Sequence, residues 1–248
     1  QVMGNYACPS PHLSSAVLSA EAILGAGSDE QKKALLEPIA TGQQIFAFAY
    51  TEPDYNWSPK AVQLRATKSG GSYTLNVTKL FVPDANVADQ IIVVARTSNG
   101  SNPEDGLSML VVDRNTPGVS VRTMTGWIGP KVCEINFENV SVDASNLLGE
   151  EGQGFPIAGN ILESARISIA AQAVGIGQAA LEAAVRQSKI RIGTAGPAAE
   201  RQFVQFALAD MATRLAAARL LTLQAAYYKD IGRPYGKESA MAKLFASE

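Results

Sequence analysis

Hydrophobic residues change their spacing twice along this chain of 248 residues. Up to about residue 43 they recur at helical spacing, Ser28 and Gln31 form a capping-box pattern, and Gly42 marks a helix end. From Ile45 the spacing becomes strand-like, with runs rich in Val, Ile, Thr, Tyr and Phe. These runs cover residues 45–51, 62–82, 90–97, 107–114, 119–124 and 133–142. Helical spacing returns near residue 155 and continues to the end.

This order of elements predicts an α+β fold. The segment "SGGS" at 69–72 is typical of a hairpin turn. The later helices are expected at about 155–190, at about 198–231 and from about 236. The predicted domains are N-terminal helices (1–44), a central antiparallel β-barrel or sandwich (45–150) and an incomplete up-and-down C-terminal helix bundle (151–248). No βαβ alternation is visible, which argues against a Rossmann domain.

Charge and composition narrow the classes of function. The chain has 21 Lys and Arg against 23 Asp and Glu, so nothing indicates a nucleic-acid partner. The only histidine, His12, excludes a multi-histidine metal site, and Cys8 and Cys133 form no ligand pattern. We therefore expect no metal, and reduced thiols in a cytoplasmic protein. The start "QVMGNYACPS" has no signal-peptide pattern.

The apolar stretch at 155–185 is the one candidate for a membrane segment. Glu163, Arg166 and Gln172 interrupt it, and Ala and Gly supply its apolar character. We expect a helix buried in a bundle and no membrane insertion. The Ala-rich helices carry more apolar surface than an antiparallel pair can hide, which predicts a dimer or a dimer of dimers. Beginning on Gln1 and ending on "KLFASE", the chain looks like a fragment.

Several segments together resemble the acyl-CoA dehydrogenase family. They occur in the order and spacing of that family from about residue 13 to the end of the chain. They are "SDEQKKALLEPIATG", "FAYTEP", "NVTKLFV", "ADQIIVVART", "NLLGEEGQGF", "ARISIAAQAVGIGQAALEAA", "QFALADMATRLAAARLLTLQAA" and "KESAMAKLFASE".

The resemblance implies a function in fatty acid metabolism. Members of the family are FAD-dependent oxidoreductases with N-terminal helices, a β domain and a C-terminal bundle. A Glu removes the α-proton of an acyl-CoA, hydride passes from Cβ to the flavin N5, and an electron-transfer flavoprotein is the expected acceptor. The family further implies a homotetramer.

The catalytic base is expected outside these residues. A second arrangement in the family places it at the position of Ala165, and Glu163 lies two residues earlier. Two residues turn a helix by about 200°, so Glu163 faces roughly the opposite side. We expect no catalytic residue in this chain.

The resemblance assigns cofactor contacts to the strand-like segments. Thr51 in "YTEP" matches a position that contacts the isoalloxazine ring, with Phe48 and Tyr50 beside it. Phe81 matches an aromatic residue against the flavin face. Pro83 stands where the family usually has a Thr that bonds near flavin N5, so one polar contact is lost. Equally, Thr51 is an ordinary strand terminus, and Phe48 and Tyr50 fit a simple core.

The remaining contacts lie in loops and on the first long helix. After "TEP" the usual Gly-rich loop is replaced by "DYNWSP", which puts Trp57 near the cofactor. Arg191 matches an Arg that reaches the FAD pyrophosphate across a dimer interface, although the following Phe-Gly is lost, and its place at a helix end is an alternative explanation. Leu162 and Arg166 are expected to line the acyl-CoA pocket, because a guanidinium buried in an apolar helix needs partners.

These departures leave two other functions open. Trp57, Pro83 and the lost Phe-Gly are also compatible with a non-catalytic or cofactor-poor partner subunit of a hetero-oligomer. A third hypothesis is flavin oxidase or monooxygenase chemistry on a substrate without CoA.

Overall fold

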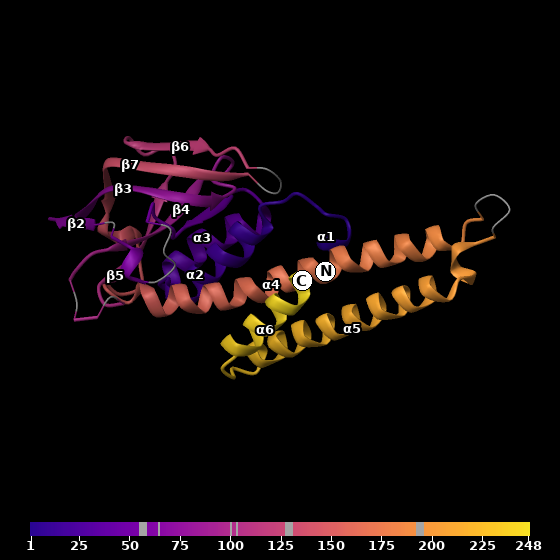
Figure 1. Ribbon diagram of the computed structural model, residues 1–248. Helices are drawn as coiled ribbons and strands as arrows, with labels where there is room; N and C mark the ends of the chain where they lie inside the picture. Colours follow the sequence, from indigo (N-terminus) through magenta and orange to yellow (C-terminus); the bar gives the residue numbers. More distant parts are fainter. Residues whose placement is uncertain (55–58, 64, 100, 103, 127–130, 192–195) are drawn as a thin grey trace. The chain divides into compact units, whose positions relative to one another are not determined.

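The computed structural model divides the chain into two compact units (Figure 1). The sheet unit contains Ser10–Leu162, and the helical unit contains Gln1–Pro9 and Glu163–Glu248. The structure describes residues 1–54, 59–63, 65–99, 101–102, 104–126, 131–191 and 196–248.

Helical elements open the sheet unit. They are the π-helix η1 (Leu13–Ser19), α2 (Ala20–Ala26) and α3 (Asp29–Thr41). The predicted capping box is confirmed, because the Ser28 hydroxyl accepts from the Gln31 amide and the Gln31 side chain accepts from the Ser28 amide. The predicted helix end is confirmed as well, since Gly42 has φ 71°.

The predicted strands are confirmed, and β8 is an addition that the sequence did not indicate. The first four strands are β1 (Phe46–Ala49), β2 (Arg65–Ser69), β3 (Ser72–Pro83) and β4 (Gln90–Arg96). The others are β5 (Leu107–Asp113), β6 (Val119–Thr123), β7 (Val132–Asp143) and β8 (Leu147–Leu148). Short 3-10 turns are η2 (Pro59–Ala61) and η3 (Ala144–Asn146).

The strands form one sheet in the order β6-β7-β3-β2-β4-β5-β8, with β1 paired to β4. The α+β class is confirmed, but the expectation of a wholly antiparallel sheet is corrected. β1 runs parallel to β4, with Phe46 opposite Gln90, and β2 meets β4 in a parallel bridge. The reason is that β1 follows a helix and pairs with a strand beyond the β2–β3 hairpin, which permits a parallel pairing.

Large apolar side chains fill the core of the sheet unit. Tyr73, Phe46 and Phe137 are among its largest buried side chains. In the same unit η1 lies against β1 and α2 against β8. The predicted hairpin is confirmed by the pairing of Ser69 with Ser72.

The helical unit contains most of α4 (Gly154–Ser188), α5 (Gln202–Asp230) and α6 (Gly236–Ser247), which agree closely with the predicted helices. The unit also holds α1 (Val2–Asn5) and the turn η4 (Ala198–Glu200). Ala170, Ala225 and Ala242 form its small core, where α6 packs against α5 (Figure 1).

The helix α4 is less buried than the sequence predicts. By length and composition it qualifies as a membrane-crossing helix, and 17% of its most apolar window is buried. One such helix is weak evidence for a membrane span. Ala170 and Val174 are buried, whereas Ile176 is 49% exposed. The described residues thus leave most of this window uncovered, so the expected burial of the helix is corrected.

Candidate functional site

A short clamp joins the chain after β1 to the middle of β3. The Lys79 ammonium donates to the Tyr50 carbonyl at 3.0 Å and to the Glu52 carboxylate at 2.8 Å. Between these contacts, the Leu80 amide donates to the Thr51 carbonyl at 2.8 Å. Three successive residues of one segment are thereby held by two successive residues of the other. We call these five residues the strand clamp.

The charged members of the clamp are buried. The side chain of Lys79 is 0% exposed and that of Glu52 is 5% exposed. Burial lowers the pKa of Lys79 to about 8, against the opposing effect of the Glu52 charge. The pKa of Tyr50 is raised, mainly by burial and then by the Glu52 charge.

Phe81 follows the clamp directly, on a β-bulge. Lys79 pairs with Ile135 and Val82 with Cys133, so Leu80 and Phe81 lie opposite the single residue Glu134. Phe81 has φ 54°, a conformation that bulky residues rarely adopt. Its side chain is 39% exposed, so the bulge presents an aromatic ring at the surface.

Most of the predicted cofactor residues belong to the sheet unit. Phe48 is buried in β1, and Tyr50 and Thr51 follow it with 8% exposure each. Pro83 ends β3 and pairs with Val132. Trp57 lies outside the described residues.

The predicted residues of α4 and beyond are divided between the units. Leu162 is half-buried and is the last residue of the sheet unit, whereas Arg166 and Arg191 belong to the helical unit. Arg166 is exposed, so the expectation of a buried guanidinium is corrected. It lies one turn before the buried Ala170 on the same face of α4, but a long arginine side chain can carry its charge out to solvent, where it needs no partner. Arg191 is exposed and forms an isolated bridge with Pro197.

Glu163 packs against the start of α6. A Cβ at Gly236 would overlap with the Glu163 carboxylate, and the neighbouring hydroxyls of Ser164 and Tyr235 are 3.0 Å apart. The side chain of Glu163 therefore lies against the first residue of α6.

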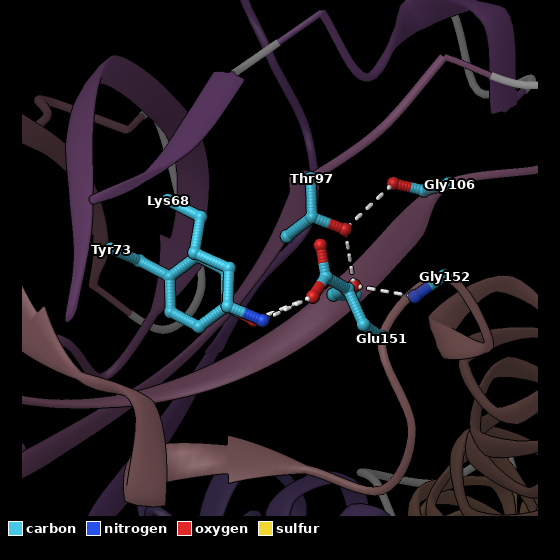
Figure 2. A network of polar contacts seen from close by, with 7 residues as sticks. Lys68, Tyr73, Thr97, Gly106, Glu151 and Gly152 are labelled. Carbon is cyan, nitrogen blue, oxygen red and sulfur yellow. Dashed lines mark hydrogen bonds and ion pairs between the residues drawn. The ribbon is translucent and has the colours of Figure 1, made fainter. Parts of the chain in front are cut away.

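A polar network anchors the connector before α4 (Figure 2). Glu151 accepts from Lys68 at 2.8 Å and from the Tyr73 hydroxyl at 2.9 Å, and the hydrogen bond from Lys68 is the main reason why the pKa of Glu151 is lowered. The Gly152 amide donates to the Ser108 hydroxyl at 2.8 Å, and Ser108 lies 2.7 Å from the Thr97 hydroxyl. The network ties β2, β3 and β5 to the segment that sequence analysis associated with the family.

A separate pocket of about 640 Å³ lies elsewhere in the sheet unit. It is lined by residues of α2, α3 and β8, including Gln31, Leu35 and Leu147. None of the predicted site residues lines it. Among the described residues, no three His, Cys, Asp or Glu side chains gather as metal ligands would.

Glu52 and Lys79 are the residues that sequence reasoning missed. Both lie in segments that carry the family resemblance, but neither was assigned a role. A signal was present, since a lysine within a strand rich in buried apolar positions needs an acidic partner. The sequence alone did not identify that partner, because 27 residues separate the two.

The lowered pKa of Lys79 predicts a pH dependence of stability. Between about pH 8 and about pH 10.4 the unfolded chain binds this proton and the folded chain releases it, so the free energy of unfolding should rise with pH. The contribution cannot exceed about 1.4 kcal/mol per pH unit. Below about pH 8 both states hold the proton, and the contribution should be constant.

Urea unfolding across this range measures the effect. The reference is the double variant Lys79→Met/Glu52→Gln, because it removes both charges of the pair. If the free energy of unfolding of the wild type rises with pH no more steeply than that of the reference, the attraction of Glu52 outweighs the effect of burial on the pKa of Lys79.

Comparisons with known proteins cover both units. Residues 47–140 match the family model "Acyl-CoA dehydrogenase, middle domain", and residues 152–248 match "Acyl-CoA dehydrogenase, C-terminal domain". An acyl-CoA dehydrogenase of Bacillus subtilis (strain 168) is 42% identical over 229 residues, which cover 91% of this chain and 60% of the relative.

Solved structures agree with this assignment. Butyryl-CoA dehydrogenase from Megasphaera elsdenii matches with a TM-score of 0.89 and 36% identity, over 94% of this chain and 62% of that one. A glutaryl-CoA dehydrogenase from Mycobacterium smegmatis, solved in complex with FADH2, matches with a TM-score of 0.85 and 28% identity, over 94% and 60%. The chain thus spans about three fifths of the length of these relatives. With both domain models matched in order along one chain, this protein belongs to the acyl-CoA dehydrogenase family.

Proposed function

We propose that this chain serves FAD-dependent α,β-dehydrogenation of an acyl-CoA thioester. The observation that carries the proposal is the bulge that presents Phe81 directly after the strand clamp, in a chain that belongs to the acyl-CoA dehydrogenase family. A strained backbone persists only where surrounding contacts hold it, and such positions cluster at ligand sites.

The described residues fit a flavin ring at two points. Phe81 offers an exposed aromatic face for stacking on a planar ring, and Thr51, held through its carbonyl, offers a hydroxyl. In this proposal Phe48 in β1, Tyr50 after it, Pro83 and Trp57 are further cofactor contacts, and Arg191 binds the pyrophosphate across a dimer interface. When bound, the flavin accepts the hydride that leaves Cβ of the thioester.

Leu162 and Arg166 are proposed to contact the acyl-CoA. The exposure of Arg166 suits this role, because an exposed guanidinium is accessible to an anionic ligand. No residue of this chain is proposed as the base that removes the α-proton. Ala165 carries no titratable group, and Glu163 is packed against Gly236.

An electron-transfer flavoprotein is the proposed oxidant, and a homo- or hetero-oligomer, arranged as a dimer of dimers, is the proposed assembly. The surface of α5 supports oligomerisation. Phe203, Phe206 and Leu220 are each at least 66% exposed, and large apolar side chains exposed along one helix favour an interface.

The visible spectrum of the protein, purified with FAD, tests this function. We expect flavin bands that bleach when the correct acyl-CoA thioester is added, in a series from short to long chains. Bound flavin that no thioester reduces would contradict the substrate class, and protein that binds no FAD would contradict the cofactor.

Pro83 favours a second candidate, a partner subunit that binds FAD weakly or not at all. Proline removes both the hydroxyl and the amide donor from this position. If the missing contact limits binding, Pro83→Thr should tighten FAD binding by up to about tenfold, the value of one net hydrogen bond. Wild-type protein that binds no FAD, together with a variant that does, would establish the second candidate.

A further inference from the structure

The strand clamp contains an ion pair whose burial calls for an explanation beyond stability. Lys79 and Glu52 are almost completely buried in the sheet unit, at 2.8 Å. Two buried charges lose more solvation than their attraction commonly returns, and apolar residues of similar volume are often as stabilising. What the charges provide, and apolar residues do not, is directional hydrogen bonding from a single ammonium group.

Those bonds define where Thr51 lies. The ammonium of Lys79 reaches the residues on both sides of Thr51, namely Tyr50 and Glu52. The Leu80 amide holds the Thr51 carbonyl itself. One contact to the Thr51 carbonyl and one to each of its two neighbours therefore hold this stretch against β3, and all three are donated by Lys79 and Leu80.

The same two residues precede the strained Phe81. A left-handed backbone at a phenylalanine is unfavourable, so its neighbours must hold it in place. Leu80 lies in the bulge and Lys79 immediately before it. A movement of Lys79 would therefore alter Thr51 and Phe81 together.

The second oxygen of Glu52 extends the clamp to a loop. It accepts from the Gln63 amide at 2.8 Å, which joins the two ends of the segment 53–62. This segment includes the sequence "DYNWSP" that departs from the family pattern. The ion pair thus also ties Gln63 to the residue that follows Thr51.

We infer that Lys79 and Glu52 are positioning residues, which set Thr51 and Phe81 in the relative geometry that a flavin ring requires. This inference rests on the proposed function. Neither residue is expected to touch the flavin or the thioester. Their role is to reduce the ordering that the site must undergo on binding.

The test compares the buried pair with an exposed pair of the same chemistry. Lys79→Met, Glu52→Gln and the double variant remove the buried pair. Lys68→Met/Glu151→Gln is the matched control, because Lys68 and Glu151 are also 2.8 Å apart in the sheet unit but are 51% and 33% exposed (Figure 2). Folding is checked by far-UV circular dichroism, and FAD binding is titrated by the quenching of flavin fluorescence.

We expect the double variant Lys79→Met/Glu52→Gln to weaken FAD binding by about tenfold or more, and the control pair to change it by no more than about twofold. The visible circular dichroism of the bound flavin should change only in the buried-pair variants. Glu52→Gln keeps one acceptor for Lys79 and should give an intermediate result. If Lys79→Met does not fold, the double variant, which leaves no single charge buried, carries the test.

A second measurement needs no flavin. Hydrogen exchange at the Leu80 amide, which bonds Thr51, should be faster in the double variant than in wild type when FAD is absent. A folded double variant with unchanged FAD affinity and unchanged flavin dichroism would overturn the inference and leave the proposed function intact. Wild-type protein that binds no FAD would instead overturn the proposed function, and with it the role of the clamp.

Discussion

Replacing Lys79 with methionine is expected to destabilise the protein by about 3 to 5 kcal/mol. Methionine fills most of the space of the lysine but leaves the Glu52 carboxylate buried without its cation. The Tyr50 carbonyl loses its donor at the same time. Chemical unfolding in urea at neutral pH measures the change in the free energy of unfolding.

The cost should depend on the charge left behind rather than on the missing contacts. The double variant Lys79→Met/Glu52→Gln is therefore expected to recover much of the loss. Glu52→Gln alone should cost less than Lys79→Met, because Lys79, with a pKa already lowered to about 8, can become neutral.

An exposed ion pair provides the comparison. Lys68→Met removes an ion pair of the same length, but the two side chains are 51% and 33% exposed, so the expected cost is about 1 kcal/mol or less. Equal losses for Lys79→Met and Lys68→Met would show that burial of the first pair has no energetic consequence.

Replacing Gly106 with alanine is the second substitution with a large expected effect. Gly106 has φ 75°, and a Cβ at this position would overlap with the Ser98 carbonyl. The left-handed backbone costs a non-glycine residue about 1 to 2 kcal/mol, and overpacking adds about 1 to 3 kcal/mol. Because the Gly106 carbonyl also accepts from Thr97, the substitution should disturb the network around Ser108 (Figure 2).

The same substitution at Gly70 separates the cost of backbone strain from the cost of overpacking. It has φ 59° in the β2–β3 turn, and a Cβ there would meet nothing within 4 Å. Gly70→Ala should therefore cost only the backbone strain, about 1 to 2 kcal/mol. Thermal unfolding of both variants measures the difference. A loss no larger for Gly106→Ala than for Gly70→Ala would mean that the loop around Ser98 moves aside without cost.

Signals that involve a few neighbouring residues were read correctly from the sequence. The capping box at Ser28 and Gln31, the Gly42 helix end, the turn at 69–72 and the long helices all agree with the structure. Each depends on hydrogen bonds or side-chain spacing within a few positions, so the local sequence is sufficient. The family was recognised for a related reason, because its segments are short and keep their order.

Contacts between distant segments could not be read in this way. The parallel pairing of β1 with β4 depends on which strand edge is available after the β2–β3 hairpin forms. The exposure of Ile176 and Arg166 on α4 depends on how much of that helix its neighbours cover. The spacing of residues in the sequence indicates that the helix is apolar, but it does not show how much of its surface other elements cover.

The site shows the same division. By itself the sequence determined the order of helices and strands and the family, and the proposal that Thr51 and Phe81 contact a flavin ring began from that resemblance. Only the tertiary structure decided that Lys79 clamps Tyr50 and Glu52, and that a bulge turns Phe81 to the surface. The physical reason is that a buried charge is tolerated only opposite its partner, and folding alone brings partners that are distant in sequence together.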